Sequence, residues 1–94
     1  MKYALITGGS RGIGRACCVK LAADGFNILI NYNSNSKAAK ETKALVEAEG
    51  VKAEILGFDV RDQAIVDSTL DAWAEKNPDA VIEVLVNNAG ITHD

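Results

Sequence analysis

The chain has 94 residues, which is enough for one small domain or for a part of a larger one. Its hydrophobic fraction of 48% and charged fraction of 24% are ordinary for a folded protein and argue against disorder. A net charge of −3 provides no basic surface, so nucleic acid and membranes are not expected partners. No apolar segment reaches the ~20 residues that span a bilayer, and no secretory signal is visible, so a cytoplasmic location is expected.

Apolar runs alternate with segments of helical periodicity along the chain. The predicted elements are a strand at 2–7, a helix at 12–24, a strand at 26–32, a helix at 37–49, a strand at 53–58, a helix between Asp62 and Pro78, and a strand at 81–86. This alternation predicts an α/β fold, the N-terminal part of a Rossmann-type doubly wound parallel sheet, βαβαβαβ, with strand order 3-2-1-4. The third helix is expected on the face opposite the first two.

Spacing and capping signals predict finer features of the helices. Ile13, Cys17 and Leu21 recur at i, i+4 and i+8 and are expected to face the sheet. Ser36 is expected to cap the second helix, and Asp62 the third.

The most informative segment is the glycine-rich turn Thr7–Gly14, which connects the first strand to the first helix. Glycine permits a tight turn and a close approach of the backbone to a ligand. The helix that follows offers unpaired N–H groups and the positive end of its dipole to a phosphate. The glycines are spaced Gly-x-x-x-Gly-x-Gly, and by itself such a loop is either a phosphate site or an ordinary structural turn.

Polar motifs also follow the other three predicted strands. Asn31–Ser34 follows the second strand, Asp59-Val60 the third, and Asn87–Gly90 the fourth. Because the carboxyl ends of parallel strands meet at one rim, where ligands of such sheets bind, we expect the four segments to line one extended site. A dinucleotide is long enough to touch all of them. Taken singly, Asp59 could be a surface or capping carboxylate, and the asparagine pair an ordinary turn.

With these three motifs, Thr7–Gly14, Asp59-Val60 and Asn87–Gly90, the chain resembles the short-chain dehydrogenase/reductase family. More narrowly, residues 10–15 and 87–92 are similar to those of 3-oxoacyl-acyl-carrier-protein reductases, the ketoreductases of bacterial fatty-acid synthesis. Related sugar and acetoacetyl-CoA reductases share much of this pattern. The resemblance covers essentially the whole chain.

The resemblance implies a nicotinamide dinucleotide cofactor and a set of residues that would bind it. These are Gly8, Gly9, Ser10, Arg11, Gly12, Ile13, Gly14, Asn31, Tyr32, Asn33, Ser34, Asp59, Val60, Asn88, Ala89 and Gly90. Backbone groups of the glycine loop would hold the pyrophosphate, and Ser10 and Arg11 would reach the adenosine ribose and its 2′-phosphate. Asp59 would accept a hydrogen bond from the adenine amino group, with the Val60 backbone against the ring. Asn88, Ala89 and Gly90 would line the ribose wall, while Asn87 would brace the central strands.

The end of the second strand bears on which cofactor is used. An acidic residue there binds the free 2′-hydroxyl of NAD and repels a phosphate. Residues 31–34 contain no acid, and Arg11 offers a planar cation suited to a phosphate. NADP(H) is therefore predicted, with NAD(H) as the alternative.

The chain lacks the family's catalytic pattern, in which a tyrosine precedes a lysine by four positions. Tyr3 and Tyr32 are followed at that spacing by Thr7 and Ser36, so no catalytic residue is assigned, and no metal site. We expect 1–94 to be the dinucleotide-binding portion of a single domain whose catalytic half is absent, inactive alone. The intact protein would reduce a 3-oxoacyl thioester of acyl-carrier protein with NADPH. The alternatives are a non-catalytic nucleotide-binding fragment and an interaction module.

Self-association is also expected. The fourth strand would be an edge although its apolar pattern is that of a central strand, and such an edge pairs readily with another chain. A single helix would cover the opposite face of the sheet poorly and leave apolar surface exposed.

Overall fold

The structure is a computed structural model that describes residues 1–88. Its elements are β1 (Lys2–Thr7), α1 (Gly12–Ala23), β2 (Asn27–Tyr32), α2 (Ser36–Glu47), β3 (Ala53–Gly57), α3 (Gln63–Lys76) and β4 (Val81–Asn87). Every predicted element is present, and the predicted bounds differ from the observed ones by at most two residues. Among the described helices, none has the length and hydropathy needed to cross a bilayer.

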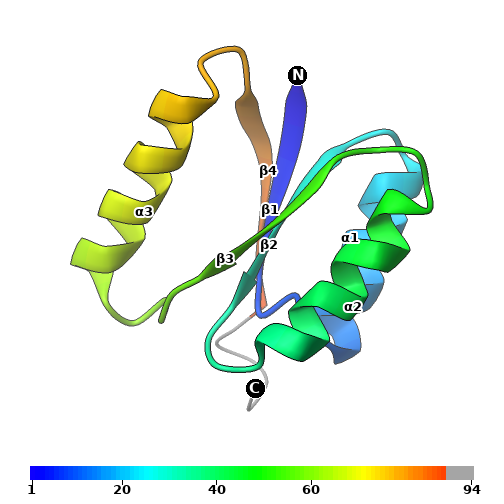
Figure 1. The fold of residues 1–94 in the computed structure, drawn as a ribbon, viewed down its shortest axis with the longest axis horizontal. Helices are drawn as coiled ribbons and strands as arrows, with labels where there is room; N and C mark the ends of the chain where they lie inside the picture. Colours follow the sequence, from blue (N-terminus) through cyan, green and yellow to red (C-terminus); the bar gives the residue numbers. More distant parts are fainter. Residues whose placement is uncertain (89–94) are drawn as a thin grey trace.

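The four strands form one parallel sheet in the order β3-β2-β1-β4, which confirms the predicted fold. Figure 1 shows α1 and α2 on one face of the sheet and α3 on the other, as expected. The β1–β4 pairing shifts register between Tyr3 and Ala4, so that Glu83 has no partner in β1. The order reverses its direction at β1 and β4, and a ligand crevice is expected at the carboxyl ends of these two strands.

The alternation of side chains along β1 divides the core into two layers. Ala4 and Ile6 lie in the cluster under α1 and α2, whereas Tyr3 and Leu5 lie in the cluster under α3. Trp73, the one buried residue of α3, packs edge-on against Tyr3 with ring centroids 4.9 Å apart. Burial and the nearby Glu54 carboxylate raise the pKa of Tyr3, in keeping with a packing role for this tyrosine.

The face that α1 turns to the sheet differs from the prediction. Gly14, Cys18 and Ala22 are buried, while Ile13 is 62% exposed, so the expectation that Ile13 faces the sheet is wrong. Cys17 and Leu21 are half-buried at the margin of the core. The buried face is shifted by one residue because the first turn of α1 approaches the loop after β1 through Gly14, which has no side chain.

The capping of α2 also differs by one residue. Asn35, not Ser36, is the N-cap, and its side-chain oxygen accepts a hydrogen bond of 3.0 Å from the Ala38 N–H. Asn and Ser are comparable caps, so composition does not separate two adjacent candidates. Asp62 caps α3 as predicted, accepting from the Ile65 N–H at 3.2 Å.

The fourth strand lies at an edge of the sheet with apolar side chains in solvent. Leu85 is 64% exposed, Val81 58% and Ile82 36%. Leu85 and Ile82 pair with Leu5 and Tyr3, so they belong to the face on which α3 lies, yet α3 covers neither of them fully. An apolar strip therefore flanks the open edge of β4.

Candidate functional site

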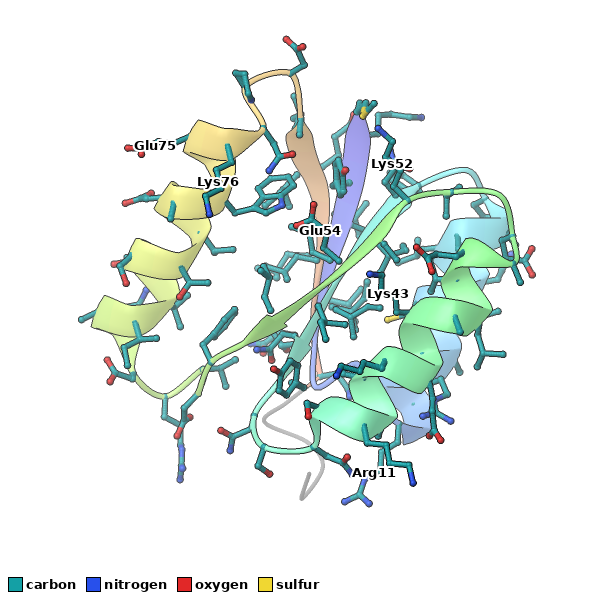
Figure 2. The ribbon with its side chains drawn as sticks, viewed as in Figure 1. Arg11, Lys43, Lys52, Glu54, Glu75 and Lys76 are labelled. Carbon is teal, nitrogen blue, oxygen red and sulfur yellow. The ribbon has the colours of Figure 1, made fainter. Side chains whose placement is uncertain are left out.

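The carboxyl ends of the strands meet at the lower edge of the molecule, where Figure 2 labels Arg11. The turn between β1 and α1 lies at this rim, together with the connections that follow β2 and β3 and with Asn88 after β4. The structure thus brings together the segments that the sequence analysis placed at one site. Ala89 and Gly90, two of the predicted binding residues, lie outside the described residues.

The turn after β1 requires glycine for two distinct reasons. Gly8 and Gly12 have φ values of 64°, a left-handed conformation that glycine adopts without steric cost. At Gly14 the constraint is space, because a Cβ would collide with the backbone carbonyl of Gly8 and lie 2.8 Å from Nδ2 of Asn88. The first turn of α1 therefore lies directly against the backbone of the preceding loop.

The N-terminus of α1 is not capped by its own N-cap side chain. Arg11 is its N-cap residue and makes no side-chain cap hydrogen bond, and the first turn carries no acidic residue. In contrast, α2 and α3 are capped by Asn35 and Asp62. The first N–H groups of a helix have no partner within it, and together with the helix dipole they favour an anion. A phosphate between the glycine turn and α1 fits this donor set.

Asn31 in β2 supports the glycine loop through hydrogen bonds to its backbone. Its side chain is 1% exposed, and its Oδ1 accepts from the Gly8 N–H at 3.1 Å. Its Nδ2 donates to the carbonyls of Phe58 at 3.0 Å and Leu56 at 3.3 Å, and its own carbonyl accepts from the Gly9 N–H at 2.9 Å. These bonds show that Asn31 supports the loop. A direct contact between Asn31 and a cofactor stays a prediction.

The end of β4 braces the same loop. The Asn88 N–H donates to Oγ1 of Thr7 at 2.9 Å, and Asn88 Nδ2 donates to the Gly8 carbonyl at 3.2 Å. Thr7 Oγ1 also lies 3.2 Å from Oδ1 of Asn87. Asn88 is 3% exposed, so it shares the bracing role that the sequence analysis assigned to Asn87.

The residues expected around the adenosine ribose differ in accessibility. Arg11 and the pair Asn33–Ser34 are exposed, Tyr32 is half-buried, and Ser10 is only 2% exposed. Arg11 is thus an exposed cation at the rim, while Ser10 belongs to the packed interior of the loop. Arg15, to which the sequence analysis assigns no role, donates from its guanidinium to the Ser10 carbonyl at 2.8 Å.

Asp59 carries an arginine partner that the sequence analysis missed. Its Oδ2 accepts from Nη2 of Arg61 at 2.8 Å, and its Oδ1 accepts from the Arg61 N–H at 2.9 Å. These bonds lower the pKa of Asp59 from 3.8 to about 2. The charged carboxylate keeps lone pairs for a further donor, such as an amino group on adenine. An aspartate two residues before an arginine in a turn is the sequence signal that could have indicated this pair.

Two of the remaining predicted residues at the rim, Val60 and Ile13, are hydrophobic. Val60 is half-buried, and the side chain of Ile13 is exposed beside the N-terminus of α1. Among residues 1–88, no three His, Cys, Asp or Glu side chains are grouped so that they could hold a metal ion.

The fold and this rim define a Rossmann-type α/β protein with a glycine-rich turn at the switch point of the sheet. The chain belongs to the short chain dehydrogenase family, whose model matches residues 2–94. The family resemblance inferred from the three motifs is therefore confirmed. Members of this family bind a nicotinamide dinucleotide and act as oxidoreductases.

Individual relatives support the same family but differ in activity. The chain is 48% identical over 91 residues to an L-2,3-butanediol dehydrogenase of Corynebacterium glutamicum, covering 96% of this chain and 34% of the relative. It is 43% identical over 98 residues to a 3-oxoacyl-[acyl-carrier-protein] reductase of Synechocystis, covering 99% and 37%. The crystal structure of acetoin dehydrogenase YohF from Salmonella typhimurium matches with a TM-score of 0.83 and 32% identity, covering 99% and 38%. The chain thus spans about a third of the length of the curated relatives it matches.

We predict that Gly14→Ala both destabilises the fold and disrupts the candidate anion site. The new Cβ would push α1 away from the Gly8 carbonyl, since neither backbone can yield without moving the loop. Overpacking of this kind costs about 1–3 kcal/mol of unfolding free energy. We also expect NADPH to bind about tenfold or more weakly, as measured by fluorescence titration, because charge-assisted hydrogen bonds to the phosphate lose their geometry.

Gly25→Ala is the matched control for this prediction. Gly25 has a φ of 98° but open space around its missing Cβ, and it lies at the far end of α1. The strained backbone costs about 1–3 kcal/mol, comparable to the cost at Gly14. Equal losses of NADPH affinity in the two variants would show that only global stability matters.

A second prediction concerns the charge state of Asp59. Removing the guanidinium in Arg61→Ala should return the Asp59 pKa from about 2 toward 3.8, as followed by carboxyl ¹³C chemical shifts against pH. Because the folded-state pKa is lowered, the pair's contribution to stability is present above pH 3.8 and is lost as the pH falls through about 2. An unchanged Asp59 titration in Arg61→Ala would mean that the ion pair is not formed in solution.

Proposed function

We propose that residues 1–94 supply the cofactor half-site of an NADP(H)-dependent reductase, the dinucleotide-binding portion of a longer single domain. The proposal rests on the N-terminus of α1, which follows the glycine turn and receives no cap hydrogen bond from its N-cap side chain. The N-cap side chains of α2 and α3 do make such a bond. The cofactor would supply a hydride carrier. A cytoplasmic location, expected from the sequence, remains a prediction.

The residues present suit the phosphates of a dinucleotide. Backbone N–H groups of Gly12, Ile13 and Gly14 would bind the pyrophosphate at the positive end of α1. Gly14 lets this helix approach the loop closely, and Asn31 and Asn88 hold the loop in place. Asp59, charged over the whole neutral range, would accept from the adenine amino group.

The preference for NADP(H) over NAD(H) rests on charge at the adenosine end. Residues 31–34 contain no carboxylate that would repel a 2′-phosphate. Arg11 is exposed at the same rim and has the planar guanidinium that binds phosphate well. Both features favour a ligand with an additional negative group on the ribose.

The proposed substrate of the intact protein is a 3-oxoacyl thioester carried by acyl-carrier protein. It is supported by the motifs at residues 10–15 and 87–92 and by the similarity to the Synechocystis reductase. A small diol or hydroxyketone is the second candidate, because the butanediol dehydrogenase is at least as similar. We expect these residues alone to hold cofactor without turning substrate over, because neither tyrosine in them is followed by a lysine four positions later.

The cofactor assignment predicts a measurable selectivity. NADPH should bind about tenfold or more tightly than NADH in a fluorescence titration, since each charge-assisted contact to phosphate contributes on that order. Arg11→Ala should remove most of this difference and change NADH binding by less than about twofold.

Lys76→Ala is the control for the loss of one positive charge, because Lys76 lies at the far end of α3. Equal effects of the two substitutions would contradict a specific role for Arg11. Reduction of an acetoacetyl thioester by the 94 residues alone would contradict the assignment of this chain to the cofactor half-site.

We also propose that the chain associates with itself through β4. Leu85, which is 64% exposed on this edge strand, is the apolar residue best placed to mediate it. Leu85→Lys should shift the chain toward monomer in sedimentation velocity, while Leu45→Lys, at a 46% exposed site on α2, should not. A monomeric unsubstituted chain would contradict the proposal.

A further inference from the structure

Arg15 joins three parts of the molecule that meet near the adenosine end of the site. Its Nη2 donates to the Ser10 carbonyl at 2.8 Å and to the Ala38 carbonyl at 3.0 Å. Its Nε donates to Oγ1 of Thr42 at 2.9 Å. One guanidinium on α1 is therefore bonded at once to the glycine loop and to Ala38 and Thr42 on α2, with a longer contact to Glu41 on the same helix.

Thr42 on α2 bonds both to Arg15 and to the same Ser10 carbonyl. It is fully buried on α2, and its hydroxyl donates to the Ser10 carbonyl at 2.9 Å while accepting from Arg15. The Ser10 carbonyl thus receives two hydrogen bonds, which is all that its two lone pairs can accept. Ser10 immediately precedes Arg11, so the direction in which Arg11 leaves the loop depends on how this peptide group is held.

The hydrogen bonds of Arg15 differ from those of a solvated arginine on the surface of a helix. Arg15 does have an acidic neighbour, Glu41, at 3.4 Å, but that carboxylate is largely exposed and such pairs contribute little. Only 29% of the Arg15 side chain is exposed, and its shortest bonds go to backbone carbonyls and to a buried hydroxyl. On the buried face of α2, Thr42 is the one polar residue beside Ala38, Ala39 and Val46, and its hydroxyl bonds to Arg15 and to the Ser10 carbonyl.

We propose that Arg15 and Thr42 are positioning residues for the 2′-phosphate of the cofactor. One wall of that subsite is the loop with Ser10 and Arg11, and the other is the turn from β2 into α2. The Arg15–Thr42 pair links the two walls and sets the distance between them. This inference rests on the proposed NADP(H) function and adds residues that contact no part of the cofactor themselves.

The test separates the 2′-phosphate from the rest of the ligand. Adenosine 2′,5′-bisphosphate and adenosine 5′-monophosphate are titrated into the chain by calorimetry, and the ratio of their dissociation constants is the readout. Thr42→Val, which alters no charge, should weaken the bisphosphate about five- to tenfold and the monophosphate by less than about twofold. Thr42→Ser keeps the hydroxyl and should retain the original ratio.

Arg15→Lys provides an independent variant that preserves charge. Arg15 uses two different nitrogens, Nε and Nη2, for its contacts, whereas a lysine has only one, so we expect the ratio to fall as in Thr42→Val. Lys20→Gln, on the same helix but paired only with Asp24, controls for changes of α1 that do not involve the loop. Thermal unfolding of each variant shows whether it is folded at the temperature of the titration.

Each result has one meaning. An unchanged ratio in both Thr42→Val and Arg15→Lys overturns the inference, and so does an equal weakening of both ligands, which indicates a merely structural role. If the unsubstituted chain binds the two ligands equally, the NADP(H) preference itself is wrong. If it binds neither, the proposed cofactor half-site is wrong. A lower ratio in both variants with the original ratio in Thr42→Ser supports the inference.

Discussion

The first turn of α1 lies against the backbone of the loop that follows β1, with no room for a side chain at Gly14. This contact decides which face of α1 is buried, and it leaves Ile13 in solvent beside the helix N-terminus. It also brings the positive end of the helix to the point where the sheet order reverses. The position of the proposed anion site therefore follows from a backbone contact and not from any charged side chain.

The loop is held in place by buried polar side chains that bond to its backbone. Asn31 supports Gly8 from β2, and Asn88 reaches the same residue from the end of β4. Arg15 fixes the Ser10 carbonyl from α1. Because these groups bond to protein, we expect the N–H groups in the first turn of α1 to determine what binds. Preorganised donors of this kind need no rearrangement when an anion arrives.

Sequence patterns predict much of this fold because strands and helices here have strong, local signals. The parallel pairing follows from the alternation of strands and helices, and the order 3-2-1-4 with α3 on the opposite face follows from the right-handed crossovers of a Rossmann-type sheet. The prediction that Ile13 faces the sheet is wrong because hydrophobic periodicity assigns every apolar residue to the buried face. Periodicity carries no information about a glycine such as Gly14, whose lack of a side chain allows close backbone contact. Arg15 and Arg61 were missed because charged residues on helices and turns are ordinarily solvated, and only the folded chain shows the carbonyls and the carboxylate that bind them.

We propose that the N-terminus of α1, which its N-cap side chain leaves uncapped, binds the phosphates of a dinucleotide. Backbone amide chemical shifts of the ¹⁵N-labelled chain, followed during titration with NADP⁺, test it most directly. We expect the largest shifts at Gly12, Ile13 and Gly14, with smaller shifts at Asp59 and little change along α3. Shifts that avoid the first turn of α1, or no saturable shifts at all, would contradict it.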